Sequence, residues 1–151
     1  MALSACGGGE DGGITPPFTP AATTRTWRLG FSPNPPRPTV PDVIRGIDLW
    51  SPRAEVALLH DDVPWSKLLS GMSADAIIDQ DKQGLVDYLR SKNLALFFTI
   101  DLTNGLAREQ EAPQLVAAGR SLAEPAIQQL ARTWALAVQR RLNPEYLGLA
   151  A

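Results

Sequence analysis

The sequence is poor in the residues that build disulfides and metal centres. Among its 151 residues there is one cysteine, Cys6, and one histidine, His60. A single cysteine excludes a disulfide within the chain, and one histidine with one cysteine excludes a thiolate-rich zinc site. His60, Asp61 and Asp101 have suitable ligand types for another metal, but no spacing signature supports such a site. We therefore expect neither a metal nor a cofactor.

Clustered positive charge and long apolar runs are also missing. The net charge is −2, and lysine and arginine are scattered along the chain, which speaks against a nucleic-acid partner. The longest apolar run near the middle, Leu94–Phe98, is far shorter than the roughly 20 residues of a membrane-spanning helix. With 44% hydrophobic and 20% charged residues, the composition predicts one globular domain with a real core.

The motif of a serine hydrolase is absent. No Gly-x-Ser-x-Gly elbow is present, and the sequence has no second histidine to serve as the base for Ser32, Ser66 or Ser121. A serine hydrolase is therefore not supported. Ser121 instead opens Ser-Leu-Ala-Glu, a capping-box pattern at the start of a helix.

The first 25 residues read as a linker. Gly- and Pro-rich sequence without apolar periodicity does not bury enough surface to fold, so we expect residues 1–25 to be disordered. Leu3-Ser4-Ala5-Cys6 resembles a bacterial lipobox, which implies lipidation of Cys6 and a flexible tether to the cell envelope. Only Met1-Ala2 precede it, where a lipobox follows a basic and an apolar segment, so an incidental cysteine is the alternative.

From residue 26 onward, short apolar runs alternate with helical patterns. Strands are expected when a run is apolar and bounded by turn residues, and helices when apolar residues recur every three or four positions. Ser73 is placed to cap the second helix. The pattern predicts strands at 26–31, 54–60, 94–100 and 145–151, and helices at 42–50, 73–92 and 124–143.

Four strands that alternate with three helices predict an α/β fold with parallel pairing and right-handed crossovers. A doubly wound sheet usually has a Gly-rich phosphate turn after its first strand, and "GFSPNPPR" contains none. Short helix-to-strand and long strand-to-helix connections instead favour a (β/α)8 barrel. Since such a barrel needs about 250 residues, we interpret residues 26–151 as the N-terminal half of one.

The order of the segments "WRLGFSPNPPR", "VALLHDDVPW", "LFFTIDLTNG", "GRSLAEPAIQQLARTWA" and "PEYLGLA" resembles the N-terminal half of a clan-A glycoside hydrolase barrel, of the kind found among endo-galactanases. The likeness rests on layout and not on an invariant motif. It implies a general acid/base glutamate just after strand four and a nucleophile after strand seven. The chain ends where that glutamate is due, so no catalytic residue is assigned, and the fragment alone is expected to be inactive.

Polar residues at the ends of strands two and three are the candidate substrate-binding groups. Carboxylates, amides and hydroxyls there would face the mouth of a barrel and grip sugar hydroxyls, and a nearby tryptophan would stack on a sugar face. Plainer roles remain open: a strand cap for the histidine, solvated acids, an Asx turn after Asp101, and a core position for Trp65, as expected for Trp27, Trp50 and Trp134. The candidates are His60, Asp61, Trp65, Asp101, Thr103 and Asn104.

Two hypotheses follow. In the first, the chain is part of a secreted or envelope-anchored glycoside hydrolase whose substrate is a polysaccharide and whose only membrane contact is a lipid on Cys6. In the second, it is a non-catalytic lipoprotein module that binds a carbohydrate or small molecule and forms a homodimer to complete its barrel, since exposed strand edges need partners. A catalytic Asp61–Asp101 pair and a non-hydrolytic barrel are weaker alternatives.

Overall fold

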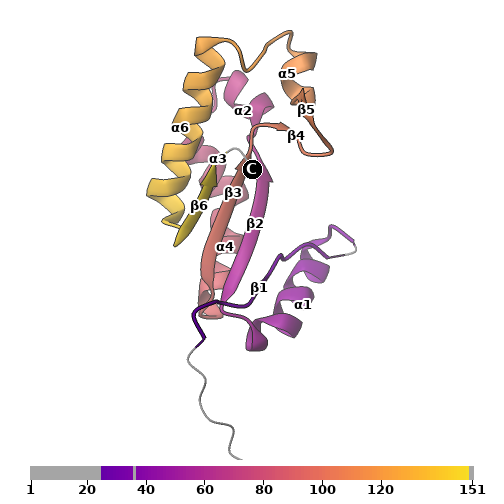
Figure 1. The fold of residues 1–151 in the computed structure, drawn as a ribbon, viewed down its shortest axis with the longest axis vertical. Coiled ribbons are helices and arrows are strands. Elements are labelled where there is room, and N and C mark those ends of the chain that lie inside the picture. The colour runs from indigo at the N-terminus through magenta and orange to yellow at the C-terminus, as the bar shows by residue number, and fades with distance from the viewer. Residues whose placement is uncertain (1–24, 36, 150–151) are drawn as a thin grey trace, which may run out of the picture.

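The computed structural model describes residues 25–35 and 37–149 (Figure 1). Cys6 and nearly all of the expected linker lie outside the described residues. No helix in the described ranges combines the length and the apolar character needed to cross a membrane.

A parallel four-stranded sheet forms the centre of the molecule. Its strands are β1 (Gly30–Phe31), β2 (Val56–Asp62), β3 (Ala95–Asp101) and β6 (Tyr146–Leu149), in the order β1-β2-β3-β6. Neighbouring strands pair in parallel throughout. The predicted α/β class and its four parallel strands are thus confirmed, but β2 continues to Asp62, two residues beyond its expected end.

Helices α1 (Val40–Trp50), α3 (Ala74–Asp81), α4 (Gln83–Ser91) and α6 (Pro125–Leu142) connect the strands, with a short 3-10 helix, η1, at Ser51–Arg53. The Ser73 hydroxyl accepts a hydrogen bond from the Ala76 amide, which confirms the predicted cap. The single helix predicted for 73–92 is wrong, because Lys82 leaves helical geometry at φ −122° and separates α3 from α4.

The two long strand-to-helix connections contain structure that the sequence pattern did not predict. The first holds helix α2 (Trp65–Leu69), and the second holds strand β4 (Thr103–Asn104), strand β5 (Ala107–Glu111) and helix α5 (Pro113–Ala117). Strands β4 and β5 form an antiparallel hairpin beyond the carboxyl end of β3 (Figure 1).

The predicted capping box at Ser121 is only half formed. The Glu124 carboxylate accepts the Ser121 amide at 2.8 Å, as a capping box requires. The Ser121 hydroxyl, however, donates to Glu111 at 2.6 Å, and α6 begins at Pro125 with Glu124 as its N-cap. Ser121 therefore ties the hairpin to the segment before α6 instead of capping the helix.

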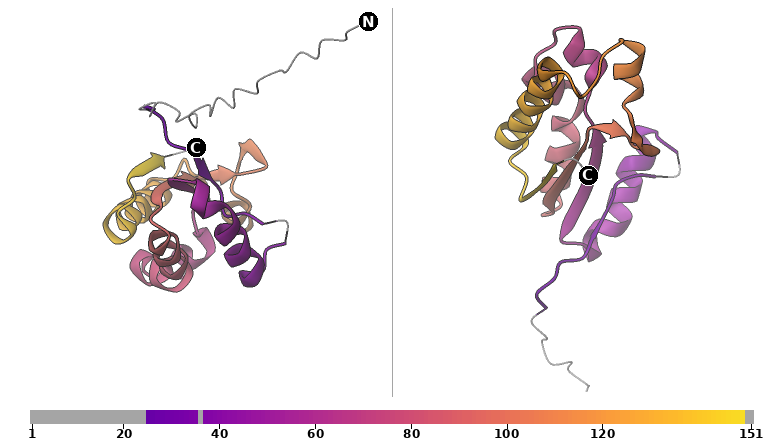
Figure 2. Two further views of the ribbon diagram at one scale, coloured as in Figure 1. Left: turned by 90° about the horizontal axis from the view of Figure 1, so that it is seen from below. Right: turned by 45° about the horizontal axis from the view of Figure 1, so that its top comes forward.

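The hydrophobic core lies between the sheet and the helices, which cover one face of the sheet and leave the other open (Figure 2). Side chains of alternate strand residues, such as Ala57, Leu59, Leu96 and Phe98, are buried on the covered face. They pack in one cluster with residues of the helices, among them Ile47, Ile77, Ile78, Leu89, Ile127, Trp134 and Val138.

The tryptophans divide between core and surface. Trp134 is fully buried, and Trp50 packs against the core, as expected. The core position expected for Trp27 is wrong, because its side chain is 61% exposed and lies against the Arg25 guanidinium, 4.7 Å from the ring centroid.

Candidate functional site

The open face of the sheet carries a polar cluster at the carboxyl ends of β2 and β3. Because successive side chains of a strand point to opposite faces, His60 and Asp62 share this face with Thr99 and Asp101. The parallel register places His60 beside Thr99 and Asp62 beside Asp101. The structure therefore brings together His60 and Asp101, as expected from the sequence, and adds Thr99 and Asp62.

Asp61 does not belong to this cluster. Its side chain points to the covered face, where one carboxylate oxygen lies 2.5 Å from Nζ of Lys82 at the α3–α4 break. Asp61 and His60 both line a cavity of about 280 Å³ beside β2, so the expectation that Asp61 binds substrate stays a prediction. The alternatives of a catalytic pair or a metal site that combine Asp61 with Asp101 are not supported, because the two carboxylates point to opposite faces of the sheet. The strand alternation, which continues to Asp62, is the reason.

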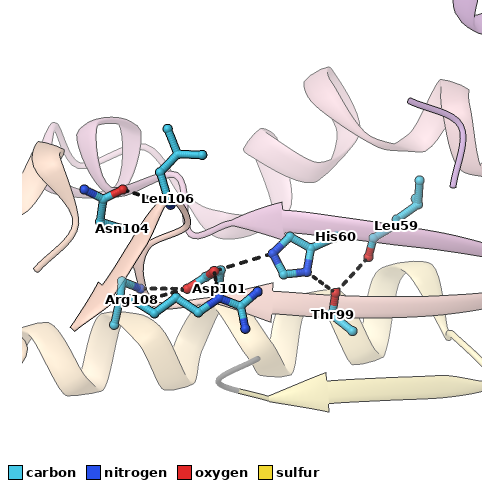
Figure 3. Close-up of polar contacts among 8 residues, drawn as sticks. Leu59, His60, Thr99, Asp101, Asn104, Leu106 and Arg108 are labelled. Atoms are coloured by element: carbon cyan, nitrogen blue, oxygen red, sulfur yellow. Dashed lines mark hydrogen bonds and ion pairs between the residues drawn. The ribbon is translucent and has the colours of Figure 1, made fainter. Parts of the chain in front are cut away.

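The His60 ring lies between Thr99 and Asp101 (Figure 3). Its Nδ1 is 2.8 Å from the Thr99 hydroxyl, and its Nε2 is 3.4 Å from Oδ2 of Asp101. The hydroxyl also lies 3.4 Å from the Leu59 carbonyl. His60 bonds to a side chain and not to the backbone, so it does not cap the strand, and 35% of its side chain remains exposed.

Asp101 is the most enclosed member of the cluster. Its side chain is 1% exposed, and Oδ1 accepts hydrogen bonds from the Thr103 amide at 3.0 Å and the Thr103 hydroxyl at 3.1 Å. Oδ2 lies 3.8 Å from Nε of Arg108 on β5. Burial raises the pKa of Asp101, but the Thr103 bonds, Arg108 and His60 together lower it below its ordinary value. Asp101 is therefore a carboxylate at neutral pH.

The pKa of Asp62 shifts in the opposite direction, above its ordinary value. Burial raises its pKa first, and the negative charges of Asp101 and Asp61 add to this effect. Neighbouring carboxyl groups whose pKa values move apart are a common feature of sites that hold and transfer protons. The sequence analysis left a solvated acid open as the role of Asp62 and did not name it as a candidate, whereas β2 extends through this residue.

Thr103 and Asn104 build the hairpin above the cluster. Thr103 uses both its amide and its hydroxyl to hold Asp101, and the Asn104 side-chain oxygen accepts the Leu106 amide at 3.1 Å. The Asx turn considered at Asp101 is present, since Oδ1 accepts the amide two residues later. Thr103 thus positions Asp101.

Trp65 lies in the core and not in the site. Its side chain is 1% exposed within α2 and packs in the same cluster as the other buried apolar residues. The expectation that it stacks on a sugar is wrong, because no ring face is open to a ligand. The alternative of a core position is the one that the burial of Trp65 supports.

An apolar layer lies below the polar cluster on the same open face. Leu58 of β2 stands beside Phe97 of β3, which stands beside Tyr146 of β6. The Phe97 and Tyr146 rings have centroids 5.8 Å apart, and both are more than one third exposed. Together with Arg28 and Gly30 they line a cavity of about 400 Å³.

Comparisons with known proteins gave no matching family model, no matching curated relative and no matching solved structure. Among residues 25–35 and 37–149, no group of three or more His, Cys, Asp or Glu side chains could hold a metal ion. The structure defines the class of protein as α/β, with one parallel sheet whose second face is open and polar at the carboxyl ends of its strands.

Proposed function

We propose that this chain is half of a (β/α)8 barrel of a glycoside hydrolase, and that the polar end of the open sheet face binds the glycan. The observation that carries the proposal is the cluster of His60, Thr99, Asp62 and Asp101 at the carboxyl ends of adjacent parallel strands. Ligands of (β/α)8 barrels bind at this end of the strands.

The arrangement of the elements supports the barrel. All four strands are parallel and the helices cover one face only, as in the outer ring of a barrel. The exposed layer of Leu58, Phe97 and Tyr146 would become interior when four more strands close the sheet, since layers of side chains fill a barrel core. A closed sheet would also pair the free edges of β1 and β6.

The chemistry of the cluster supports a carbohydrate ligand. A sugar hydroxyl both donates and accepts hydrogen bonds, so it suits a site that mixes carboxylates with cationic or neutral donors. Asp62 and Asp101 accept, whereas Arg108 donates and His60 can do either. Charged partners strengthen such bonds, and the exposed His60 and Arg108 are reachable from solvent.

No catalytic residue is assigned within residues 25–149. The resemblance places the catalytic carboxylates after strands four and seven, and β6, the fourth strand of the sheet, ends at Leu149. The lipid anchor on Cys6, and with it the cell-envelope location, remains part of the proposal.

The test is the affinity of the chain for labelled oligosaccharides, with β-1,4-linked galactan fragments first. His60→Ala removes ring hydrogen bonds and should weaken binding by roughly 3- to 10-fold, the value of one net hydrogen bond. Asp87→Asn on the outer surface of α4 is the matched control and should leave affinity unchanged. Equal affinities of wild type and His60→Ala, with both folded, would contradict the proposal.

A second candidate is a binding module whose two copies complete one barrel. The exposure of Phe97 (37%) and Tyr146 (45%) on the open face favours it, because apolar surface of this kind is normally covered. Light scattering over a concentration series decides between this module and the glycoside-hydrolase half-barrel. A dimer that Tyr146→Lys dissociates supports the module, whereas a monomer at all concentrations excludes it.

A further inference from the structure

We propose that the cavity on the covered face of β2 binds a small neutral alcohol, with its apolar body among the cavity walls and its hydroxyl between Asp61 and Lys82. The cavity has a volume of about 280 Å³ and lies between the β1–α1 loop, α1, β2 and the α3–α4 break. The site goes beyond the proposed glycan function, because Asp61 points away from the open face of the sheet.

The walls of the cavity are mainly apolar. Residues of the loop, of α1, of β2 and of α4 contribute to them, namely Pro33, Pro35, Pro38, Val43, Leu59 and Leu85. Val40 at the start of α1 also lines the cavity and is 76% exposed, so it marks the opening to solvent. Since an apolar cavity of about 150 Å³ is large enough to hold benzene, this one has room for a six-membered ring with a short substituent.

The polar end of the cavity is the ion pair of Asp61 and Lys82. Nζ of Lys82 lies 2.5 Å from Oδ2 of Asp61, and this oxygen is buried. The two side chains remain 28% and 23% exposed, respectively. Because Oδ2 is covered, Oδ1 is the carboxylate oxygen that a ligand reaches, and an ammonium group has three N–H donors. The cavity therefore offers a ligand one acceptor and one donor side by side.

Charge decides which polar group fits between them. A ligand carboxylate would pair with Lys82 but be repelled by Asp61, and a ligand ammonium would pair with Asp61 but be repelled by Lys82. A hydroxyl donates its proton to Asp61 and accepts from Lys82, and hydrogen bonds to charged partners are the stronger ones. A sugar would leave most of its hydroxyls against apolar walls, where an unpaired polar group is costly. One hydroxyl on an apolar body is therefore the matching ligand.

The experiment is titration of the ¹⁵N-labelled chain at neutral pH with four ligands that share one ring: benzyl alcohol, toluene, benzoate and benzylamine. We expect benzyl alcohol to bind about 10-fold more tightly than toluene, the value of a hydrogen bond to a charged group. It should also bind more tightly than either charged ligand. The amide shifts should be confined to the residues around the cavity, at 39–43, 59–61 and 82–85.

Two variants test the polar end and the walls separately. Lys82→Met keeps the aliphatic stem and removes the N–H donors, so it should reduce the preference for benzyl alcohol by about 3-fold or more. Lys92→Met removes the partner of Asp48 from an ion pair outside the cavity and is the matched control, with the preference unchanged. Val43→Phe fills the cavity and should abolish the binding of all four ligands. Urea unfolding shows that each variant is folded.

The outcomes decide the inference even if Val43→Phe fails to fold, because Lys82 is partly exposed and its substitution leaves the walls intact. Toluene, benzoate or benzylamine that binds as tightly as benzyl alcohol overturns the hydroxyl site, as does an unchanged preference in Lys82→Met. Shifts confined to the open face, full affinity in a folded Val43→Phe variant, or no shifts with any ligand also overturn it. The glycan proposal survives each of these results, since its hydrogen-bonding groups lie on the other face of the sheet.

Discussion

Gly148 in β6 should resist substitution because its neighbour in β3 leaves no room for a side chain. A Cβ at this position would lie 2.9 Å from Cγ2 of Thr99 and 3.7 Å from a ring carbon of Phe97. Since real Cβ contacts are longer than this, either Thr99 or the β3–β6 pairing has to move. Overpacking of this kind costs about 1–3 kcal/mol.

The assay is urea unfolding of Gly148→Ala beside Gly84→Ala. Gly84 lies in α4 with nothing within 4 Å of its added Cβ, so alanine there should stabilise the chain by about 0.5–1 kcal/mol. The variant pair Gly148→Ala with Thr99→Ser removes the clashing methyl group, keeps the hydroxyl beside His60, and should recover most of the loss. A Gly148→Ala variant as stable as Gly84→Ala would refute the packing described here.

Three further predictions concern single contacts. Ser73→Ala removes the hydroxyl that accepts the Ala76 amide and should cost about 1 kcal/mol in urea unfolding. The Leu96 amide, bonded to the Glu145 carboxylate at 2.6 Å, lowers the pKa of Glu145. This stabilisation is fully present above the unfolded pKa, about 4.3, and is lost as pH falls through the lowered folded value. Glu145→Gln should therefore lower the melting temperature of the chain at pH 7 and not at pH 2. A decrease of the same size at both pH values would contradict this prediction. Trp65→Ala, at a 1% exposed position, should cost about 3–5 kcal/mol, whereas an undiminished unfolding free energy would place the ring at the surface.

The sequence pattern predicts the elements that bury an apolar stripe and misses those that do not. Strands β2 and β3 have nearly continuous apolar runs, and α6 repeats apolar residues at helical spacing, so burial and periodicity agree. Helix α2 has only five residues and β5 reads Ala-Arg-Glu-Gln-Glu, too short or too polar for either signal. Asn104-Gly105 is a known hairpin signal that the sequence interpretation passed over.

The site is predictable in part for a related reason. His60 and Asp101 follow from their place at strand ends, but Asp62 joins them only because β2 extends two residues further and pairs it with Asp101. Strand ends are the least certain feature of a sequence pattern, and one residue reverses the face. Arg108 was missed because it reaches Asp101 only through the β4–β5 hairpin, a contact that depends on tertiary structure.

The most direct test of the glycan proposal is a map of backbone amide shifts as a galactan oligosaccharide is added to the ¹⁵N-labelled chain. We predict shifts confined to the ends of β2 and β3 and to the hairpin, at residues 60–62 and 99–108, with His60 and Gly105 among those that move most. Shifts spread over the outer surfaces of α1, α4 and α6, or no shifts at saturating oligosaccharide, would contradict the proposal that the open face binds carbohydrate.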